Sequence, residues 1–382
     1  MAAPTKALRT DEMVLSMGPQ HPSTHGVLRL ELKTDGEVVE EAIPHIGYLH
    51  RNFEKHAESL PYFQIIPYTD RMDYIAAMNN ELGFVLAVEK LMELGGKPIS
   101  IPEKAQYIRV VVCEMNRIAS HLLAFGTYGM DIGALTPFLY AFRDRETILG
   151  LFEDICGARL LYNYIRFGGV SRDLTPDFHH KLRRFLSKFE KNIDSYNTLL
   201  TNNKIFLERT KGVAVMSIDK AIQYGWTGPN LRGSGMKWDL RKDEPYSIYD
   251  RFDFEVPVGE IGDCWDRYKV RMDEMRESVR IVRQALDQME EKGLLDDPNY
   301  AAKVSAKLRP PVGEVYFRTE TPRGDLGYYI QSDGTNVPSR VKVRSPCFTA
   351  LSAMRELSRG LLVADIIAII GSIDIVMGEI DR

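Results

Sequence analysis

The chain has 382 residues, of which 44% are hydrophobic and 27% are charged, a composition that is ordinary for a folded protein. Its net charge is −4 and it contains no basic run, which excludes a general attraction to nucleic acid. Residues 1–12 lack the apolar core of a signal peptide. The most apolar stretch, residues 361–370, contains Asp365 and is shorter than the roughly 20 residues that a membrane span needs, so we expect membrane attachment only through partners.

The N-terminal part is predicted to form a β-hairpin. Residues 27–32 alternate apolar and polar side chains, residues 34–36 (TDG) are typical of a turn, and residues 37–42 can return as a second strand. We expect residues 1–66 to form an N-terminal unit that carries this hairpin and a functional loop. Residues 67–382 are expected to form one continuous core.

Helical patterns dominate the rest of the chain. Asp70 is predicted to cap the first helix, Gly126 to end the second, and a loop is expected at residues 224–257. The predicted helices span residues 72–94, 105–125, 135–164, 175–202, 263–291 and 349–369, and strands are expected within residues 312–333 and 341–343. The expected fold class is α+β, mainly an α-helical bundle with small antiparallel sheets at the N-terminus and near the C-terminus.

The four cysteines are far apart in the sequence, and no pair has the CxxC spacing that is typical of zinc and iron–sulfur sites. We therefore predict reduced thiols and no metal bound by this chain. No Walker loop or GxGxxG fingerprint is present, so we expect no nucleotide cofactor either. The cysteines are Cys113, Cys156, Cys264 and Cys347.

Three places in the sequence could carry chemistry. The segment 17–26 (MGPQHPSTHG) holds His21 and His25, which can donate protons near neutral pH, although composition alone favours a structural loop. Tyr74 is expected on one helix face with Met78 and Glu81, either as a hydrogen-bond donor to a carbonyl oxygen or as a core tyrosine. Asp131 is either a helix cap or the partner that orients a histidine.

Seven stretches in chain order resemble the D subunit of the proton-translocating NADH:quinone oxidoreductase, respiratory complex I. One short match would carry little weight, but seven in the same order over nearly the whole chain are specific. They are residues 18–30 (GPQHPSTHGVLRL), 45–55 (HIGYLHRNFEK), 68–74 (YTDRMDY), 131–137 (DIGALTP), 228–242 (GPNLRGSGMKWDLRK), 256–262 (VPVGEIG) and 371–382 (GSIDIVMGEIDR).

This family is similar to the large subunit of nickel–iron hydrogenases, so the resemblance implies a hydrogenase-large-subunit-like fold. Hydrogenases hold their metal with two CxxC pairs. Asp73, Ala76, Val376 and Glu379 stand in those four positions here, so the thiolates that nickel prefers are missing. The resemblance implies that hydrogenase activity is absent and that the vacated space is open to another substrate.

The resemblance assigns roles to four residues. His25 and Tyr74 match the residues that hydrogen-bond the two carbonyl groups of a quinone headgroup, and Asp131 matches the acid that pairs with the histidine. Arg51 matches an arginine that faces the terminal iron–sulfur cluster of the neighbouring B subunit. Leu161 departs from the family, because many relatives carry a histidine there that links the cluster potential to pH.

The resemblance implies a two-electron, two-proton reduction of quinone at the interface with the B subunit, coupled to proton translocation. It places FMN and the iron–sulfur clusters on partner subunits, and it implies contacts with the C subunit and with other peripheral-arm and membrane-arm subunits. The expected location is the cytoplasmic side of the cell inner membrane, as a peripheral subunit. The alternatives are a metal-free structural subunit of a hydrogenase-like or ferredoxin-driven complex, which would not need His25, Tyr74 and Asp131 together, and a free-standing soluble enzyme.

Overall fold

The computed structural model describes residues 12–19 and 26–382 of the chain. The strands are β1 Glu12–Met17, β2 Arg29–Asp35, β3 Val38–His45, β4 Ile165–Arg166, β5 Gly169–Val170, β6 Gly313–Thr321, β7 Gly324–Ser332 and β8 Arg340–Arg344. The α-helices are α1 Phe53–Ala57, α2 Tyr62–Thr69, α3 Ala77–Leu94, α4 Glu103–Asp131, α5 Leu135–Cys156, α6 Phe178–Tyr196, α7 Lys204–Thr210, α8 Ile218–Gln223, α9 Gly228–Gly233, α10 Leu240–Asp243, α11 Cys264–Glu291, α12 Pro346–Ser352, α13 Met354–Ser358, α14 Val363–Ile373 and α15 Met377–Asp381. A π-helical turn follows α6 at Asn197–Thr201, and 3₁₀ turns occur at Tyr249–Arg251 and Leu294–Asp296.

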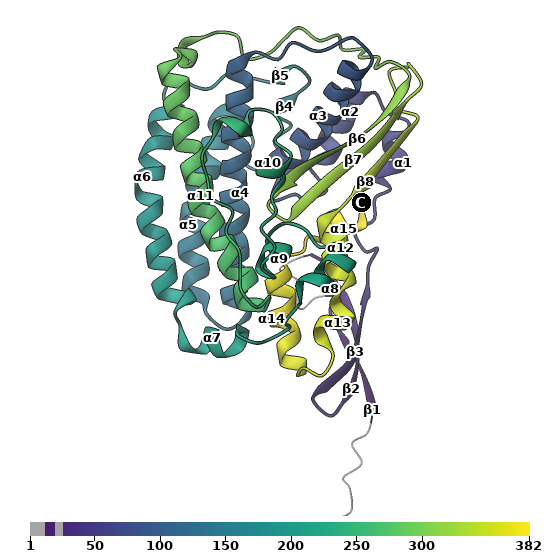
Figure 1. The fold of residues 1–382 in the computed structure, drawn as a ribbon, viewed down its shortest axis with the longest axis vertical. Coiled ribbons are helices and arrows are strands. Elements are labelled where there is room, and N and C mark those ends of the chain that lie inside the picture. The colour runs from purple at the N-terminus through teal and green to yellow at the C-terminus, as the bar shows by residue number, and fades with distance from the viewer. Residues whose placement is uncertain (1–11, 20–25) are drawn as a thin grey trace, which may run out of the picture.

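Four long helices, α4, α5, α6 and α11, stand side by side as a bundle (Figure 1). Helix α4 packs against both α5 and α11, and its residues are buried along nearly its whole length. The predicted end of this helix at Gly126 is wrong, because α4 continues to Asp131. A Cβ atom at Gly126 would lie 3.1 Å from the Cα atom of Phe138, so this glycine allows the close approach of α5 and does not stop the helix.

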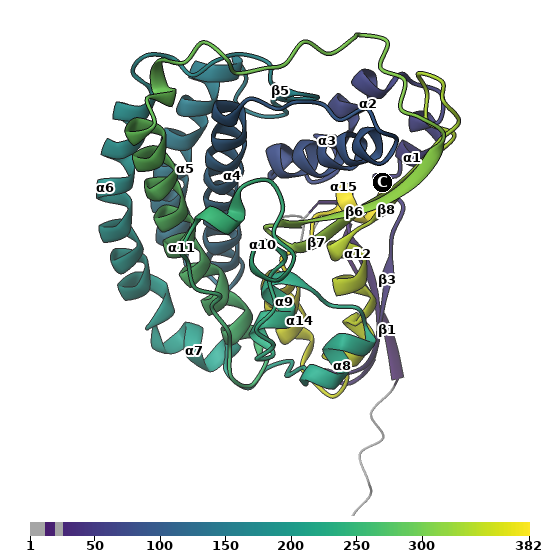
Figure 2. The same ribbon diagram turned by 45° about the horizontal axis from the view of Figure 1, so that its top comes forward.

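Two small antiparallel sheets lie beside the bundle. The sheet β6-β7-β8 packs against α3, whereas the sheet β1-β2-β3 projects from the other end of the molecule (Figures 1 and 2). The predicted hairpin is confirmed as β2 and β3. The prediction missed β1, whose side chains are exposed or half-exposed on both faces and therefore lack the alternation that marks a half-buried strand.

The first two helix boundaries around the predicted site differ from expectation. Helix α3 begins at Ala77 and not at residue 72, and Asp70 is the C-cap of α2 instead of an N-cap. The side-chain amide of Asn80 explains this, because it donates hydrogen bonds to the carbonyl oxygens of Thr69 and Asp73, each at 3.2 Å. These bonds hold the intervening residues as a turn, which no local sequence pattern shows.

Other predicted elements were too long. Helix α5 ends at Cys156, because Gly157 adopts a left-handed φ of 79° that terminates the helix. The expected helix 349–369 is divided into α12, α13 and α14, and the expected loop 224–257 contains α9 and α10. The predicted fold class is nevertheless confirmed: long helices dominate, and the antiparallel sheets lie near the two ends of the chain. Within residues 12–19 and 26–382, we find no helix that is long and apolar enough to cross a membrane.

Candidate functional site

The turn of residues 70–76, between α2 and α3, carries Tyr74. Tyr74 therefore does not share a helix face with Met78, which corrects the expectation from helical spacing. Asn116 of α4 holds the end of the turn, since its Oδ1 accepts a hydrogen bond from the Met78 amide at 3.1 Å and its Nδ2 donates to the Ile75 carbonyl at 3.3 Å. The turn is thus fixed to the buried face of the bundle, while the Tyr74 ring is only half-buried.

Gly26 is the residue at which the described part of the chain resumes, and it lies directly against Tyr74. Gly26 has a φ of 101°, and a Cβ atom there would lie 3.2 Å from the Tyr74 hydroxyl oxygen and 2.9 Å from the Cβ atom of Met377. Only a glycine allows the backbone to come this close in this conformation. His21 and His25 lie outside the described residues, so their predicted role stays a prediction, although His25 is the chain neighbour of Gly26.

Helix α15 lies on another side of Tyr74. A Cβ atom at Gly378 would lie 3.2 Å from Cδ1 of Tyr74 and 2.6 Å from the Met72 carbonyl oxygen, so the helix backbone rests on the turn. Burial raises the pKa of the Tyr74 hydroxyl, and the neighbouring Asp73 carboxyl raises it further. The hydroxyl therefore stays protonated near neutral pH and can donate a hydrogen bond.

Arg51 lies on the outside of the same turn. Its Nη2 atom donates a hydrogen bond of 2.9 Å to the Arg71 carbonyl oxygen, and its side chain is exposed. A small cavity of about 90 Å³ lies between Arg51 and helix α15. The residues that line this cavity are Arg51, Phe53, Tyr68, Arg71, Met72, Gly378 and Arg382. The structure thus brings Arg51 and Tyr74 to one turn, with Arg51 on the accessible side.

Asp131 is the last residue of α4 and is half-buried. It lies about three helical turns beyond Ser120, the α4 residue that reaches the base of the Tyr74 turn through Arg323. The helix-cap alternative for Asp131 is wrong, because Asp131 is the last residue of α4 and Ile132 is its C-cap. Its pairing with His25 stays a prediction, since His25 is not among the described residues.

The four positions of the hydrogenase cysteines lie together under Tyr74 and are all buried. Asp73 and Ala76 belong to the turn, where the Ala76 amide donates to the Asp73 carbonyl at 3.0 Å, and the Glu379 amide donates to the Val376 carbonyl at 3.1 Å. Asp73 lies close enough to Glu379 that its charge raises the pKa of the Glu379 carboxyl.

A buried arginine, Arg323, lies beside Asp73, one of these four positions. Arg323 Nη1 donates to Asp73 Oδ2 at 2.8 Å and to Ser120 Oγ at 2.6 Å, while Nη2 lies 3.4 Å from Asp374 Oδ2. Arg323 thus links Asp73 to Asp374 beside the vacated metal position, and the opening of that position to another substrate stays a prediction. Tyr74 itself is only half-buried, in contrast to the four positions beneath it.

Sequence analysis missed Arg323, Asp374 and Cys347 as members of this site. Arg323 lies in the tight turn between β6 and β7, where the surrounding Pro and Gly residues indicated only a turn. The Cys347 thiol accepts a hydrogen bond from the Val376 amide at 3.4 Å, and it belongs to α12. No local pattern could have found these residues, because their partners are hundreds of positions away or lie on another helix.

The loop after α5 lies beside the Asp70 end of the turn. The Asn163 amide donates a hydrogen bond of 2.9 Å to Asp70 Oδ2, and Leu161 two residues earlier has a left-handed φ of 56°. This conformation is unusual for a residue with a bulky side chain. The departure at Leu161 therefore lies near the site, and its effect on a partner's cluster stays a prediction.

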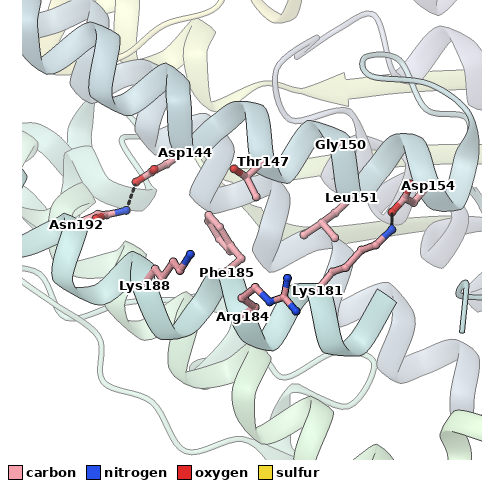
Figure 3. Close-up of a pocket in the computed structure, with 10 residues that line it drawn as sticks. All are labelled: Asp144, Thr147, Gly150, Leu151, Asp154, Lys181, Arg184, Phe185, Lys188 and Asn192. Atoms are coloured by element: carbon pink, nitrogen blue, oxygen red, sulfur yellow. Dashed lines mark hydrogen bonds and ion pairs between the residues drawn. The ribbon is translucent and has the colours of Figure 1, made fainter. Parts of the chain in front are cut away.

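A surface hollow of about 430 Å³ lies elsewhere, between α5 and α6 (Figure 3). Lys181 bonds Asp154 at 2.6 Å and Asn192 bonds Asp144 at 2.7 Å across it. It contains none of the predicted site residues. Arg184 and Lys188 also line it and form no ion pair among the described residues, and we assign the hollow no role.

Potential metal ligands are scattered through the fold. Within residues 12–19 and 26–382, no three His, Cys, Asp or Glu side chains are grouped so that they could hold a metal ion. The thiols of Cys113, Cys264 and Cys347 are buried and free, and Cys156 is free and half-buried. A metal-free chain remains the prediction.

Comparison with known proteins gives the family. Residues 131–382 match the model of the respiratory-chain NADH dehydrogenase 49 kDa subunit. The chain is 56% identical to the D subunit of NADH-quinone oxidoreductase from Chlorobaculum tepidum over 99% of this chain and 94% of that protein. The D subunits from Chlorobaculum parvum (56% identity, 99% and 94% covered) and Chlorobium luteolum (55%, 99% and 95%) are similar over the same extent. The chain therefore belongs to the family of NADH-quinone oxidoreductase D subunits, which is the 49 kDa subunit family of the respiratory-chain NADH dehydrogenase.

Proposed function

We propose that this chain works as one subunit of an NADH-quinone oxidoreductase and holds the quinone headgroup while it is reduced. Tyr74 and His25 donate hydrogen bonds to the two carbonyl oxygens, and Asp131 pairs with His25. The observation that carries this proposal is the close approach of Gly26 to the Tyr74 hydroxyl, because Gly26 follows His25 directly in the chain.

The chemistry follows from the protonation states. A quinone takes up two electrons and two protons, so the residues at its oxygens must be protonated when the electrons arrive. Burial and the Asp73 charge raise the pKa of Tyr74, which supports its role as a donor. A histidine paired with an acid, as proposed for His25 and Asp131, is easier to protonate and supplies the second proton.

The electrons come from a partner. We place the B subunit, with the terminal iron–sulfur cluster, on the side of the exposed Arg51, and FMN and the remaining clusters on further subunits. The C subunit and the other peripheral-arm and membrane-arm subunits complete the complex, which couples quinone reduction to proton translocation. This chain itself is proposed to be peripheral, on the cytoplasmic side of the membrane.

The Tyr74→Phe variant tests the proposal. The ring stays, so the packing against α15 is kept, and only the hydroxyl and its hydrogen bond are lost. A neutral hydrogen bond contributes about 0.5–1.5 kcal/mol, so the apparent affinity for quinone should fall several-fold, with a larger fall in turnover if the hydroxyl also donates a proton. The measurement compares NADH:quinone activity with NADH:ferricyanide activity in the same membranes.

The control is Tyr140→Phe, an exposed tyrosine on α5. Ferricyanide accepts electrons before they reach this chain, so its reduction should be unchanged in both variants. Equal quinone activity in Tyr74→Phe and the parent would remove Tyr74 from the site and favour the metal-free structural role. An equal fall in both activities would show that the complex had not assembled, and the quinone-to-ferricyanide ratio would then not support the proposal.

A further inference from the structure

Glu379 is a fully buried carboxyl group on α15, one residue after the glycine that rests on Tyr74. Neither of its oxygens makes a hydrogen bond with any residue in the described part of the chain. The Cys347 thiol faces it without reaching ordinary hydrogen-bond geometry. A buried carboxylate without a partner is expensive, whereas the protonated acid is neutral and costs far less.

The arginines nearby are engaged elsewhere. Arg323 is bonded to Asp73 and paired with Asp374, and Arg271 Nε lies 3.6 Å from the Asp374 carboxylate. These two guanidinium groups therefore pair with carboxylates other than Glu379. Arg344 bonds a hydroxyl and two carbonyl oxygens, and it forms no ion pair with Glu379 among the described residues. The titratable and charged groups that face Glu379 are Asp73 from the turn, Arg323 from the β6–β7 turn, Tyr328 from β7, Arg344 from β8 and Cys347 from α12, and Tyr74 contacts the adjacent Gly378.

Hydrogen bonding decides whether Asp73 or Glu379 carries a proton. Burial raises the pKa of both Asp73 and Glu379. Arg323 donates directly to Asp73 and so favours its charged form, whereas Glu379 has no such donor. The proton of this pair therefore resides on Glu379, whose pKa burial and the Asp73 charge raise to about 7.

We propose that Glu379 is the buried proton-holding residue of the Tyr74 site, where its neutral form allows negative charge to build up on the substrate. Glu379 is a positioning residue, since it acts through the charge beneath the site and does not touch the headgroup. When it ionises, it adds an unpaired negative charge below Tyr74, which opposes the arrival of electrons on the quinone. This inference rests on the function proposed above.

The test is the pH profile of the assembled complex. In the parent, the ratio of NADH:quinone to NADH:ferricyanide activity should fall on the alkaline side, because the protonated fraction of a carboxyl group drops roughly tenfold for each pH unit above its pKa. Glu379→Gln stays neutral at every pH, so its ratio should change less than about twofold across the same range, provided that the amide is accommodated. An unchanged alkaline fall in Glu379→Gln would overturn the inference.

A matched control is Glu320→Gln. Glu320 is also a buried carboxyl with a pKa that burial raises to about 7, but Arg232 donates to it at 2.9 Å and it is not in the group facing Tyr74. Its replacement should leave the pH profile as in the parent, and the same loss of pH dependence in both variants would overturn the specific role of Glu379.

Infrared difference spectroscopy keeps the inference testable if Glu379→Gln fails to assemble. The parent complex should show the carbonyl band of a buried protonated carboxylic acid that disappears as the pH rises through neutrality. If Glu379→Gln assembles, it should lose a band that Glu320→Gln keeps, and an unchanged spectrum would contradict the assignment. Absence of the band in the parent overturns the inference. Failure of the proposed function would give a different result from failure of this inference. In that case the ratio of NADH:quinone to NADH:ferricyanide activity in Tyr74→Phe would match that of the parent at every pH, whatever the pH profile of Glu379→Gln.

Discussion

Two groups of buried charges in this molecule have the same degree of burial but opposite protonation. In the core between α4 and α11, Glu114 is bonded by both Arg117 and Arg241. Burial alone would raise its pKa, yet the two guanidinium groups lower it to about 2. Under Tyr74, Glu379 has no arginine of its own among the described residues, and its pKa is raised to about 7.

The difference shows that pairing, more than burial, sets the charge of an interior carboxyl group. In the core, Arg232 and Arg241 likewise hold the pKa of Asp239 at about 2 despite its burial. Glu320 is the instructive exception. Burial raises its pKa, and the charge of Asp239 adds to this rise to about 7, because Glu320 shares Arg232 with Asp239 and Glu274.

Breaking the paired cluster should have the largest effect. Arg232→Met leaves Glu274, Glu320 and Asp239 without their shared cation, so we expect the free energy of unfolding to fall by about 3–5 kcal/mol. Hydrogen exchange of the α11 amides in the assembled complex measures this loss. Lys181→Met is the control, because its pair with Asp154 is largely exposed and solvent screens such a pair. Protection in Arg232→Met equal to that of the control would contradict the expected cost.

The unpaired carboxyl should make stability depend on pH. The pKa of Glu379 is raised from 4.5 to about 7, so folded protein keeps a proton that the unfolded chain releases. This contribution of Glu379 to the free energy of unfolding is therefore fully present below about pH 4.5. It is lost as the pH rises to about 7, and the loss is about 3 kcal/mol.

Glu379→Gln cannot ionise, so it should lack this part of the pH dependence. The difference in free energy of unfolding between the variant and the parent should therefore grow as the pH rises from 5 to 8, in favour of the variant and by about 3 kcal/mol. Thermal unfolding of the parent and the variant across this pH range provides the measurement. Parallel curves would mean that Glu379 is ionised at all these pH values.

The smallest effect is expected at Ser120, whose hydroxyl accepts a hydrogen bond from Arg323 at 2.6 Å. Ser120→Ala removes this bond, but Arg323 keeps Asp73 and Asp374, so the cost should be about 1 kcal/mol. Exchange of the α4 amides checks this, with the exposed Ser187→Ala as control. A loss as large as that in Arg232→Met would show that Ser120 is essential to the ion-pair network.

The elements that could be predicted share one property: their own side chains determine them. Helix α11 begins one residue after its predicted start, with Asp263 as its N-cap, and ends at its predicted end, Glu291. Strands β6 and β7 form within the range where strands were expected. The boundaries that failed depend on distant groups. Gly126 could not be recognised as a helix contact without α5, and the turn before α3 could not be recognised without the amide of Asn80.

The candidate site divides in the same way. Tyr74, Asp131, His25 and Arg51 were identified through the resemblance of short motifs. The structure places Tyr74 beside Gly26, and Arg51 donates a hydrogen bond to the turn that carries Tyr74. Periodicity alone put Tyr74 on a helix, which was wrong. Arg323, Asp374 and the state of Glu379 were not predictable, because each depends on partners from several elements.

By itself the sequence determined the helical class of the fold, the hairpins, the family motifs and the absence of paired cysteines, because local side-chain patterns and residue identities contain this information. Only the tertiary structure decided which buried carboxyl groups form an ion pair with an arginine. Ion pairing requires donor and acceptor within about 4 Å, and the chain brings Asp73, Arg323 and Asp374 to that distance from three separate segments. The protonation of Glu379 follows from that arrangement, since its carboxyl group is buried and makes no hydrogen bond among the described residues.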